Sequence, residues 1–166
     1  KIKKNISSAS YDPYYNTSDS SEILNKKYDV ITLWHVLEHV YDLDSFWIQI
    51  DKLLEVKGFL FIAVPNFNSM EKKYFMEDWA AYDLPRHLYH FTDRTLELYL
   101  QKKGFMILEK KRMLLDTLYI SILSSKKKNN ISRLKAIVIS LIVIFKVILK
   151  GANYSSSLFY VCQKNK

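Results

Sequence analysis

The sequence predicts an α/β fold in which apolar strands alternate with helices. Two runs, YDVITLW (28–34) and GFLFIAVPN (58–66), are short, continuous and apolar, as strands buried on both faces of a sheet are. The segments that follow them, 42–58 and 92–104, carry apolar residues at helical spacing instead. An alternation of strand and helix is the signature of a sheet covered by helices.

The first 27 residues differ from the rest of the chain. They are rich in Ser, Asn, Asp, Lys and Tyr and show almost no apolar periodicity. Such a composition is typical of a loose surface segment. We therefore expect residues 1–27 to be a polar, poorly ordered lead-in, and residues 28–166 to form the folded domain.

The first predicted helix follows the strand at 28–34. Asp42 or Asp44 is suited to its N-cap, and Gly58 is suited to its end. Between them, one helical face is apolar: Phe46, Ile50, Leu53 and Leu54.

The second predicted helix begins after Thr92, which can cap it, and ends near Gly104. A third strand is expected at 105–113. It becomes less apolar toward its end, as an edge or antiparallel strand does. A fourth strand is expected at 156–164.

The apolar segment 131–151 lies before this last strand. Placed at about 100° per residue, its polar residues share one side of a helix and leave a wide apolar face: Ser132, Arg133, Lys135, Ser140, Lys146 and Lys150. This pattern favours an amphipathic helix over a membrane span. The helix could dock on the domain, pair with a second subunit in a homo-oligomer, or contact a membrane surface through residues 131–150. Its position before a strand favours docking.

The run WHVLEHV contains His35, Glu38 and His39 at the H-x-x-E-H spacing of one class of zinc peptidases. On a helix, His35 and His39 would share one face and could bind zinc, with Glu38 acting on a bound water. His35, however, sits where a strand ends and the chain turns toward a helix. A metal-dependent hydrolase is kept as an alternative function. It would use His35 and His39 as ligands, Glu38 to act on the water, and a third protein ligand from elsewhere in the chain.

Three stretches, YDVITLWHVLEHV, GFLFIAVPN and YDLPRHLYHFTDRTLELYLQKKGF, resemble in order and spacing the C-terminal half of a class I S-adenosylmethionine-dependent methyltransferase. The nearest group is the ubiquinone-biosynthesis O-methyltransferase type. The resemblance implies the C-terminal part of a doubly wound, Rossmann-like sheet. It also implies S-adenosylmethionine as cofactor, bordered by Leu33, Trp34 and His35 at the carboxyl end of their strand.

Some enzymes of that group place a divalent metal on E-x-x-E-H at this position. Here His35 stands where the first Glu would be, and a hard cation prefers carboxylate oxygen. We therefore assign no metal ligand from the sequence.

The family's cofactor loop is rich in glycine, because the backbone must approach the ligand closely. This chain has three glycines, Gly58, Gly104 and Gly151, and none lies near the N-terminus. We expect a portion of the domain that follows this loop and is inactive by itself. A catalytically inactive, methyltransferase-like interaction module is the alternative.

The segment WAAYDLPRHLYHF (79–91) has the residue types that line a pocket for a small acceptor. Trp79, Tyr82 and Arg86 are the expected substrate-binding residues, with Arg86 suited to a carboxylate or phosphate. A hydroxyl acceptor must lose its proton, and histidine titrates near neutrality. The expected catalytic bases are His39, His87 and His90.

Composition limits the partners and the compartment. The net charge is +8, but the lysines are spread out and no nucleic-acid motif accompanies them, so nucleic-acid binding is not predicted. The single cysteine cannot form an intrachain disulfide and fits a reducing, cytoplasmic location, with possible membrane association. A small-molecule acceptor is the expected partner.

Overall fold

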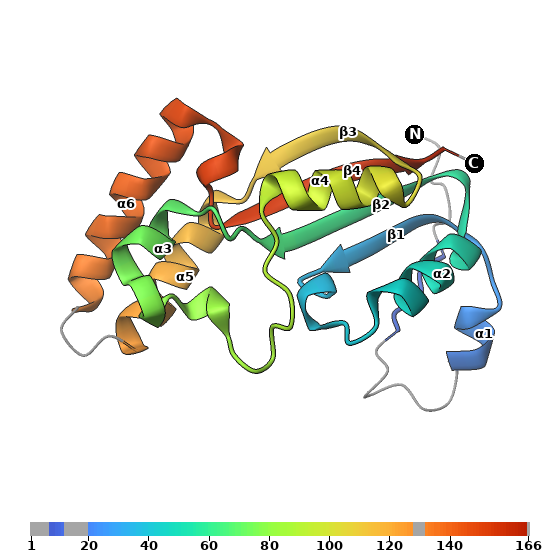
Figure 1. Ribbon diagram of the computed structural model, residues 1–166, viewed down its shortest axis with the longest axis horizontal. Helices are drawn as coiled ribbons and strands as arrows, with labels where there is room; N and C mark the ends of the chain where they lie inside the picture. Colours follow the sequence, from blue (N-terminus) through green and yellow to red (C-terminus); the bar gives the residue numbers. More distant parts are fainter. Residues whose placement is uncertain (1–6, 12–19, 128–131, 166) are drawn as a thin grey trace.

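A computed structural model describes residues 7–11, 20–127 and 132–165. Its centre is a four-stranded mixed sheet in the order β1-β2-β4-β3 (Figure 1). β1 and β2 run parallel, and β4 runs antiparallel to both of its neighbours. The strands are β1 (Tyr28–Trp34), β2 (Leu54–Pro65), β3 (Phe105–Arg112) and β4 (Ser157–Lys164). The predicted fold class, an α/β sheet of the Rossmann-like kind, is confirmed.

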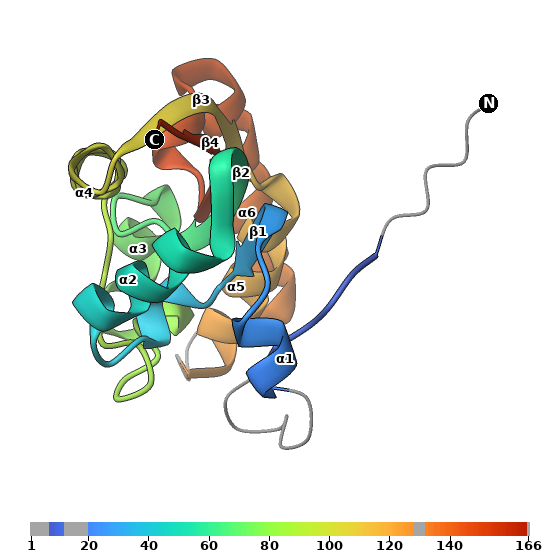
Figure 2. The ribbon, with the colours of Figure 1, turned by 90° about the vertical axis from the view of Figure 1, so that its right-hand side faces the viewer.

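The helices form two groups. α2 (Leu43–Leu53) and α4 (Asp93–Lys102) lie on one face of the sheet, as the end-on view shows (Figure 2). α3 (Met70–Phe75), α5 (Leu114–Lys127) and α6 (Arg133–Lys150) pack together beyond the carboxyl ends of β1 and β2 (Figure 1). A short helix, α1 (Ser20–Leu24), precedes β1. It lies within the predicted lead-in, most of which falls outside the described residues.

Each group of helices has its own apolar core. The first core joins the sheet to α2 and α4, and Leu33, Trp47, Leu60, Leu96 and Tyr160 are among its buried members. The second core joins α3, α6 and the segment after α3. Its buried members are Phe75, Trp79, Ala81, Ala136, Ile139, Val143 and Val147. The candidate site lies where the two groups of helices meet.

The predicted N-caps and the predicted end of the second helix are confirmed. The Asp42 carboxylate accepts hydrogen bonds from the backbone N–H groups of Asp44 and Ser45, both at 3.1 Å, and so begins α2. Thr92 forms a reciprocal capping box with Thr95 at the start of α4. Gly104 follows α4 with φ of +85°, the left-handed conformation expected after a helix.

The prediction that Gly58 ends the first helix is wrong. α2 ends at Leu53 and β2 begins at the next residue, so Gly58 lies inside β2. A Cβ at Gly58 would lie 2.8 Å from the carbonyl oxygen of Glu55, so no side chain fits there without a shift of the backbone. This glycine is therefore required by a close backbone approach and not by a helix end.

The prediction that β1 is buried on both faces is also wrong. Of its side chains only Leu33 is buried, while Val30 and Trp34 are about half exposed. Among the described residues β1 pairs only with β2, so its outer edge carries no strand. The unpaired outer edge leaves backbone N–H and C=O groups of β1 open to solvent.

α6 docks on the domain, as its position before β4 favoured, but it docks through an unexpected face. Ser140, expected on the polar side of the helix, is fully buried. Within the described residues, no helix is long and apolar enough to cross a membrane.

Candidate active site

The chain turns sharply after β1, at His35. His35 has φ of +52°, a left-handed conformation that is uncommon for a side chain of this kind, and its N–H donates to the Ala63 carbonyl at 2.9 Å. This extends the pairing of β1 with β2 by one bond. A single turn of 3-10 helix, Leu37–His39, follows. His35 and His39 therefore do not lie on one helix.

Two carboxylates hold the His35 ring. Its Nδ1 lies 3.1 Å from Glu38 Oε1, and its Nε2 lies 3.3 Å from Asp116 Oδ2 on α5. Hydrogen bonds to Asp116 and Glu38 raise the pKa of His35 to about 9, against the opposing effect of burial. His35 is therefore a cation at neutral pH and links the end of β1 to α5.

Glu38 is the buried acid of the site, with 1% of its surface exposed. Its Oε1 accepts a hydrogen bond from His35 Nδ1. The other oxygen, Oε2, has no hydrogen-bond partner among the described residues. Its backbone carbonyl accepts the N–H groups of Leu88 and Tyr89, at 2.8 and 3.3 Å. These bonds fix the loop that contains His87 against the turn that contains His39.

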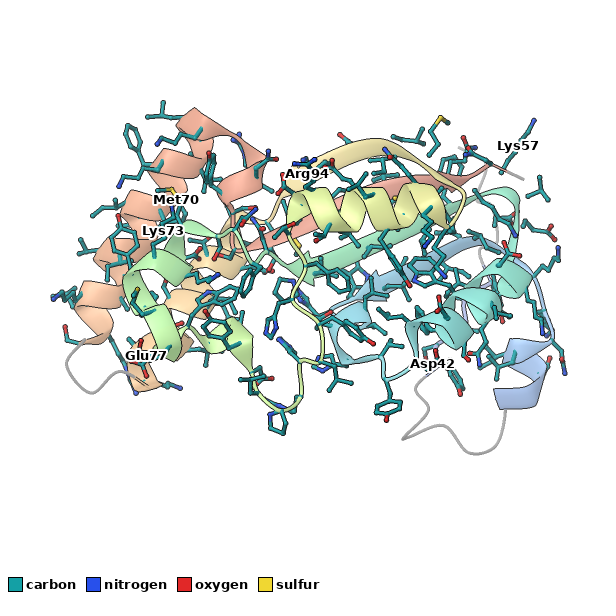
Figure 3. All side chains as sticks on the ribbon, in the orientation of Figure 1. Asp42, Lys57, Met70, Lys73, Glu77 and Arg94 are labelled. Carbon is teal, nitrogen blue, oxygen red and sulfur yellow. The ribbon has the colours of Figure 1, made fainter. Side chains whose placement is uncertain are left out.

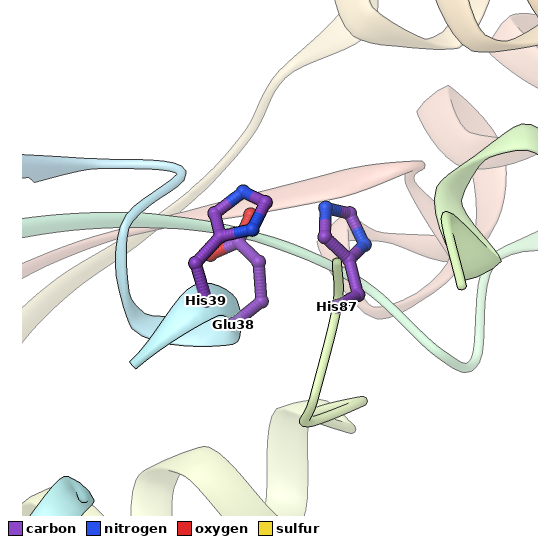
Figure 4. A group of neighbouring side chains, drawn as sticks. All are labelled: Glu38, His39 and His87. Carbon is purple, nitrogen blue, oxygen red and sulfur yellow. The ribbon is translucent and has the colours of Figure 1, made fainter. Parts of the chain in front are cut away.

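His39 and His87 lie edge to face, with ring centroids 4.6 Å apart (Figure 4). His39 Nδ1 donates to the Arg86 carbonyl at 3.1 Å, and His87 Nδ1 donates to the Ala81 carbonyl at 2.8 Å. A carbonyl only accepts, so each Nδ1 carries a proton and each Nε2 has a free lone pair when the ring is neutral. In the described part of the chain, no hydrogen bond to either Nε2 is found.

The electrostatics of His87 favour the neutral ring. Burial lowers the pKa of His87 below its ordinary value, because a charged imidazolium loses solvation there. The nearest carboxylate oxygen, on Asp83, is 3.8 Å from His87 Nε2, too far for a hydrogen bond. A neutral imidazole with a free Nε2 is the form that accepts a proton.

Glu38, His39 and His87 together form a candidate cation site. One ligand atom each from Glu38, His39 and His87 all lie within 4.8 Å of one another. The Nδ1–H bonds to backbone carbonyls orient both rings, as in metal-binding histidines generally. The zinc site proposed from the H-x-x-E-H spacing, with His35 and His39 as ligands, is not assembled. Both nitrogens of His35 are engaged by carboxylates.

His90 and the predicted acceptor residues occupy a different environment. The His90 ring packs among Phe67, Tyr82 and His87, and its Nε2 bonds to the Tyr82 carbonyl at 3.1 Å. Trp79 is fully buried and packs edge to face on Tyr82. These aromatic rings form a wall behind the His39–His87 pair and belong to the second core.

The Arg86 side chain points to solvent, with 75% of it exposed, and pairs with Asp83 at 2.7 Å. Its backbone carbonyl, and not its guanidinium, contacts His39. A surface hollow lined by α2, α4 and Tyr89 lies nearby, but none of the predicted site residues lines it.

The predicted cofactor residues differ in what they can offer. The Leu33 side chain is buried in the first core and so offers a ligand no exposed side-chain surface. Trp34 is 53% exposed and stacks on Phe159 with ring centroids 5.3 Å apart and planes inclined by 9°. Ala63 lies between them in the sheet register, and its small side chain leaves room for the two rings to meet.

A sulfonium nucleoside partly fits these residues. Trp34 presents a flat exposed ring at the carboxyl end of β1, suited to stacking on a base. The described residues supply no glycine-rich cradle, because Gly58 is inside β2 and Gly104 and Gly151 follow helices. Among the described residues, the Trp34 ring is thus suited to a base, and none supplies a backbone cradle for the rest of the cofactor.

Sequence reasoning missed Asp116. It lies on α5, a helix that was not predicted, and no motif links it to His35. The signal for Glu38 was present, since it was named with the two histidines. Its burial and its role in fixing the loop at Leu88 could not be read from spacing.

Comparison with known proteins agrees with this fold. The family described as Methyltransferase domain matches residues 3–110, about two thirds of the chain. The chain therefore belongs to this methyltransferase-domain family. No curated protein matches it.

Solved structures share the fold at low identity. The cyclopropane synthase MmaA2 from Mycobacterium tuberculosis superposes with a TM-score of 0.50 and 16% identity, over 86% of this chain and 57% of its own. The 4+2 cyclase SpnF gives a TM-score of 0.50 and 14% identity, over 83% and 50%. Phosphoethanolamine N-methyltransferase 2 from Haemonchus contortus, in complex with S-adenosyl-L-methionine, gives 0.47 and 15%, over 84% and 34%.

The chain thus spans between about a third and three fifths of the length of these proteins. Their names describe different reactions, so the likeness establishes the fold and leaves the acceptor open.

Proposed function

We propose that the protein takes part in methyl transfer from S-adenosylmethionine to a hydroxyl of a small-molecule acceptor. The observation that carries this proposal is the His39–His87 pair at the carboxyl end of β1, with both Nε2 atoms free to accept a proton. Membership of the methyltransferase-domain family supports the cofactor. The chain matches only part of its structural neighbours, so the activity is proposed for the full-length protein.

When bound, S-adenosylmethionine supplies a methyl group on a sulfonium. The leaving group is a neutral thioether, so it needs no protonation. The protein must place the acceptor in line with that methyl group and remove the acceptor's proton. Trp34 provides a stacking surface at the end of β1. His39 and His87, held by their Nδ1–H bonds, present two basic nitrogens after the same strand end.

Glu38 and His35 position these groups. The Glu38 carbonyl fixes the loop that contains His87, and the His35 cation partly neutralises the buried Glu38 carboxylate. The Trp79–Tyr82–His90 wall excludes water from one side of the pair. Of the two rings His87 is the more shielded, and its lowered pKa favours the neutral form that accepts a proton.

The test uses full-length protein and S-adenosylmethionine with an isotopically labelled methyl group, incubated with a cellular small-molecule extract. Mass spectrometry should find the label in an O-methyl ether. Trp34→Ala should weaken cofactor binding by about tenfold, since stacking of a base on an aromatic ring is worth about 1–3 kcal/mol. The matched control is Leu98→Ala, an exposed apolar residue on α4. Label found only on nitrogen or carbon would contradict the hydroxyl acceptor.

A second candidate role for the same residues is metal-assisted chemistry. Glu38, His39 and His87 would hold a divalent ion, and the unpartnered Glu38 Oε2 favours this. Such an ion would polarise the acceptor oxygen. Metal analysis of the purified full-length protein distinguishes the two roles: a stoichiometric ion lost in both Glu38→Gln and His87→Ala supports the metal site and removes His87 as the base.

A further inference from the structure

α6 has two faces of opposite kinds. Its inward face is made of small or β-branched residues packed against α3 and α5: Ala136, Ile139, Ser140, Val143 and Val147. Its outward face carries eight large apolar side chains, each between 38% and 72% exposed: Leu134, Ile137, Val138, Leu141, Ile142, Phe145, Ile148 and Leu149. Side chains project from α6 away from the rest of the molecule (Figure 3).

This distribution is the reverse of a helix on a water-exposed surface, which turns its apolar stripe inward. At about 100° per residue, the eight apolar residues fill an arc of about 140°. The exposed Arg133 borders this arc on one side and the exposed Lys135 borders it on the other, whereas Lys146, next to Lys135, is half-buried and donates to the Tyr74 hydroxyl. An apolar arc of this size with basic edges is the pattern of a helix lying in a membrane interface.

α5 follows the same inverted pattern. Its buried residues are Thr117, Ser121, Ser124 and Ser125, whereas Leu115 and Tyr119 are 84% and 63% exposed. Helices that pack through small and hydroxyl-bearing residues and present large apolar ones outward are typical of a lipid environment. Two adjacent helices therefore share this arrangement.

The charge of the α5–α6 region indicates what kind of surface would cover the outward face of α6. From residue 117 to Gly151 there are seven Lys and Arg residues and no Asp or Glu. Lys126, Arg133, Lys135 and Lys150 are exposed. Asp116, the acid nearest in sequence, is bound to His35. Two copies meeting through this face would bring like charges together, whereas an anionic surface would complement them.

We propose that the outward face of α6 lies in the interface of an anionic phospholipid bilayer, with its basic edges against the lipid headgroups. The helix then lies parallel to the membrane plane and does not cross it. Lys126 and Lys150, at the ends of α5 and α6, add to the attraction, which scales with anionic lipid and falls with salt.

The test is vesicle flotation of the chain with neutral phosphatidylcholine vesicles and with vesicles containing about a third phosphatidylglycerol. Flotation is chosen because aggregated protein sediments and bound protein rises. The wild type should float with the anionic vesicles, and its partition coefficient should fall at least tenfold with neutral vesicles or at high salt.

Leu141→Glu/Phe145→Glu should lower binding to the anionic vesicles at least tenfold, since both residues are exposed and their replacement leaves the inward face intact. Leu98→Glu, on α4, is the matched control and should bind as the wild type does. Circular dichroism checks that both variants fold. Arg133→Gln/Lys135→Gln should reduce the preference for anionic lipid by a smaller factor.

Two outcomes would overturn the proposal. One is a wild type that does not float with anionic vesicles. The other is a dimer, seen by analytical ultracentrifugation without lipid, that Leu141→Glu/Phe145→Glu dissociates, because the occupant of the face would then be a second copy of the chain.

Discussion

His35 and His39 lie four residues apart, and the structure holds them in opposite ways. His35 is fixed between two carboxylates, with both ring nitrogens engaged and its pKa raised to about 9. His39 uses Nδ1 to bond a backbone carbonyl and pairs with His87, which does the same. The first histidine is a structural cation, and the other two form a basic pair.

The difference shows that spacing alone does not assign the role of a histidine. An i, i+4 pair shares a face only if the intervening residues are helical. Here φ of +52° at His35 breaks the helix before it starts, and the ring turns toward Asp116. The backbone at the end of β1 therefore decides that His35 is bound to Asp116 and that His39 packs against His87.

The largest expected effect is on catalysis by the basic pair. In the full-length protein, His39→Ala or His87→Ala should lower turnover by about a hundredfold or more, as loss of a general base does, and leave cofactor binding nearly intact. The defect should ease as the pH rises, because the acceptor then ionises unaided. His90→Ala, which removes a ring from the aromatic wall, is the comparison variant and should have a smaller effect.

Steady-state kinetics across pH measures this. Near-normal turnover in both His39→Ala and His87→Ala would show that neither histidine is the general base. The reaction would then rest on positioning alone.

The next effect is on stability and belongs to His35. His35→Ala leaves the buried Glu38 carboxylate without its hydrogen-bond donor, which should lower the free energy of unfolding by about 1–3 kcal/mol. His39→Ala should cost no more than about 1 kcal/mol, since His39 is exposed and loses one bond to a carbonyl. Urea titration of both variants tests the contrast, and equal midpoints for His35→Ala and the wild type would refute the structural role of His35.

A smaller effect appears in the pH dependence of stability. The folded-state pKa of His35 is raised from 6.5 to about 9, so its contribution is fully present below pH 6.5 and is lost as pH rises through about 9. After a discount for the 40% exposure of the side chain, the contribution is about 1–2 kcal/mol.

The measurement compares the free energy of unfolding of the wild type with that of His35→Gln from pH 6 to pH 9.5. The advantage of the wild type should shrink toward the alkaline end. Parallel curves would mean that the His35 ring is not charged in the folded protein.

The sequence predicted most of the sheet and little of the site. The strands and the caps at Asp42 and Thr92 have local signals, because apolar runs and capping residues act within a few positions. α5 has none: it buries Thr117, Ser121 and Ser124, so its inward face does not look apolar. A periodicity that assumes apolar residues face inward cannot find such a helix.

The predicted site residues also differ in whether a local sequence signal was enough to place them. His39, His87 and His90 were named because histidine suits a general base, and the structure brings His39 and His87 into contact. Trp79 and Tyr82 were named for their residue type, yet they pack in the second core. Contacts between distant segments, such as His35 with Asp116, arise from packing and leave no local pattern.

The most direct test of this contrast is the protonation of the imidazoles, read from nitrogen-15 chemical shifts of a labelled protein at pH 7.5. The structure predicts that His35 carries protons on both nitrogens and that His87 is neutral with its proton on Nδ1. A neutral His35, or a His87 protonated on Nε2, would contradict the assignment of the structural cation and the basic pair.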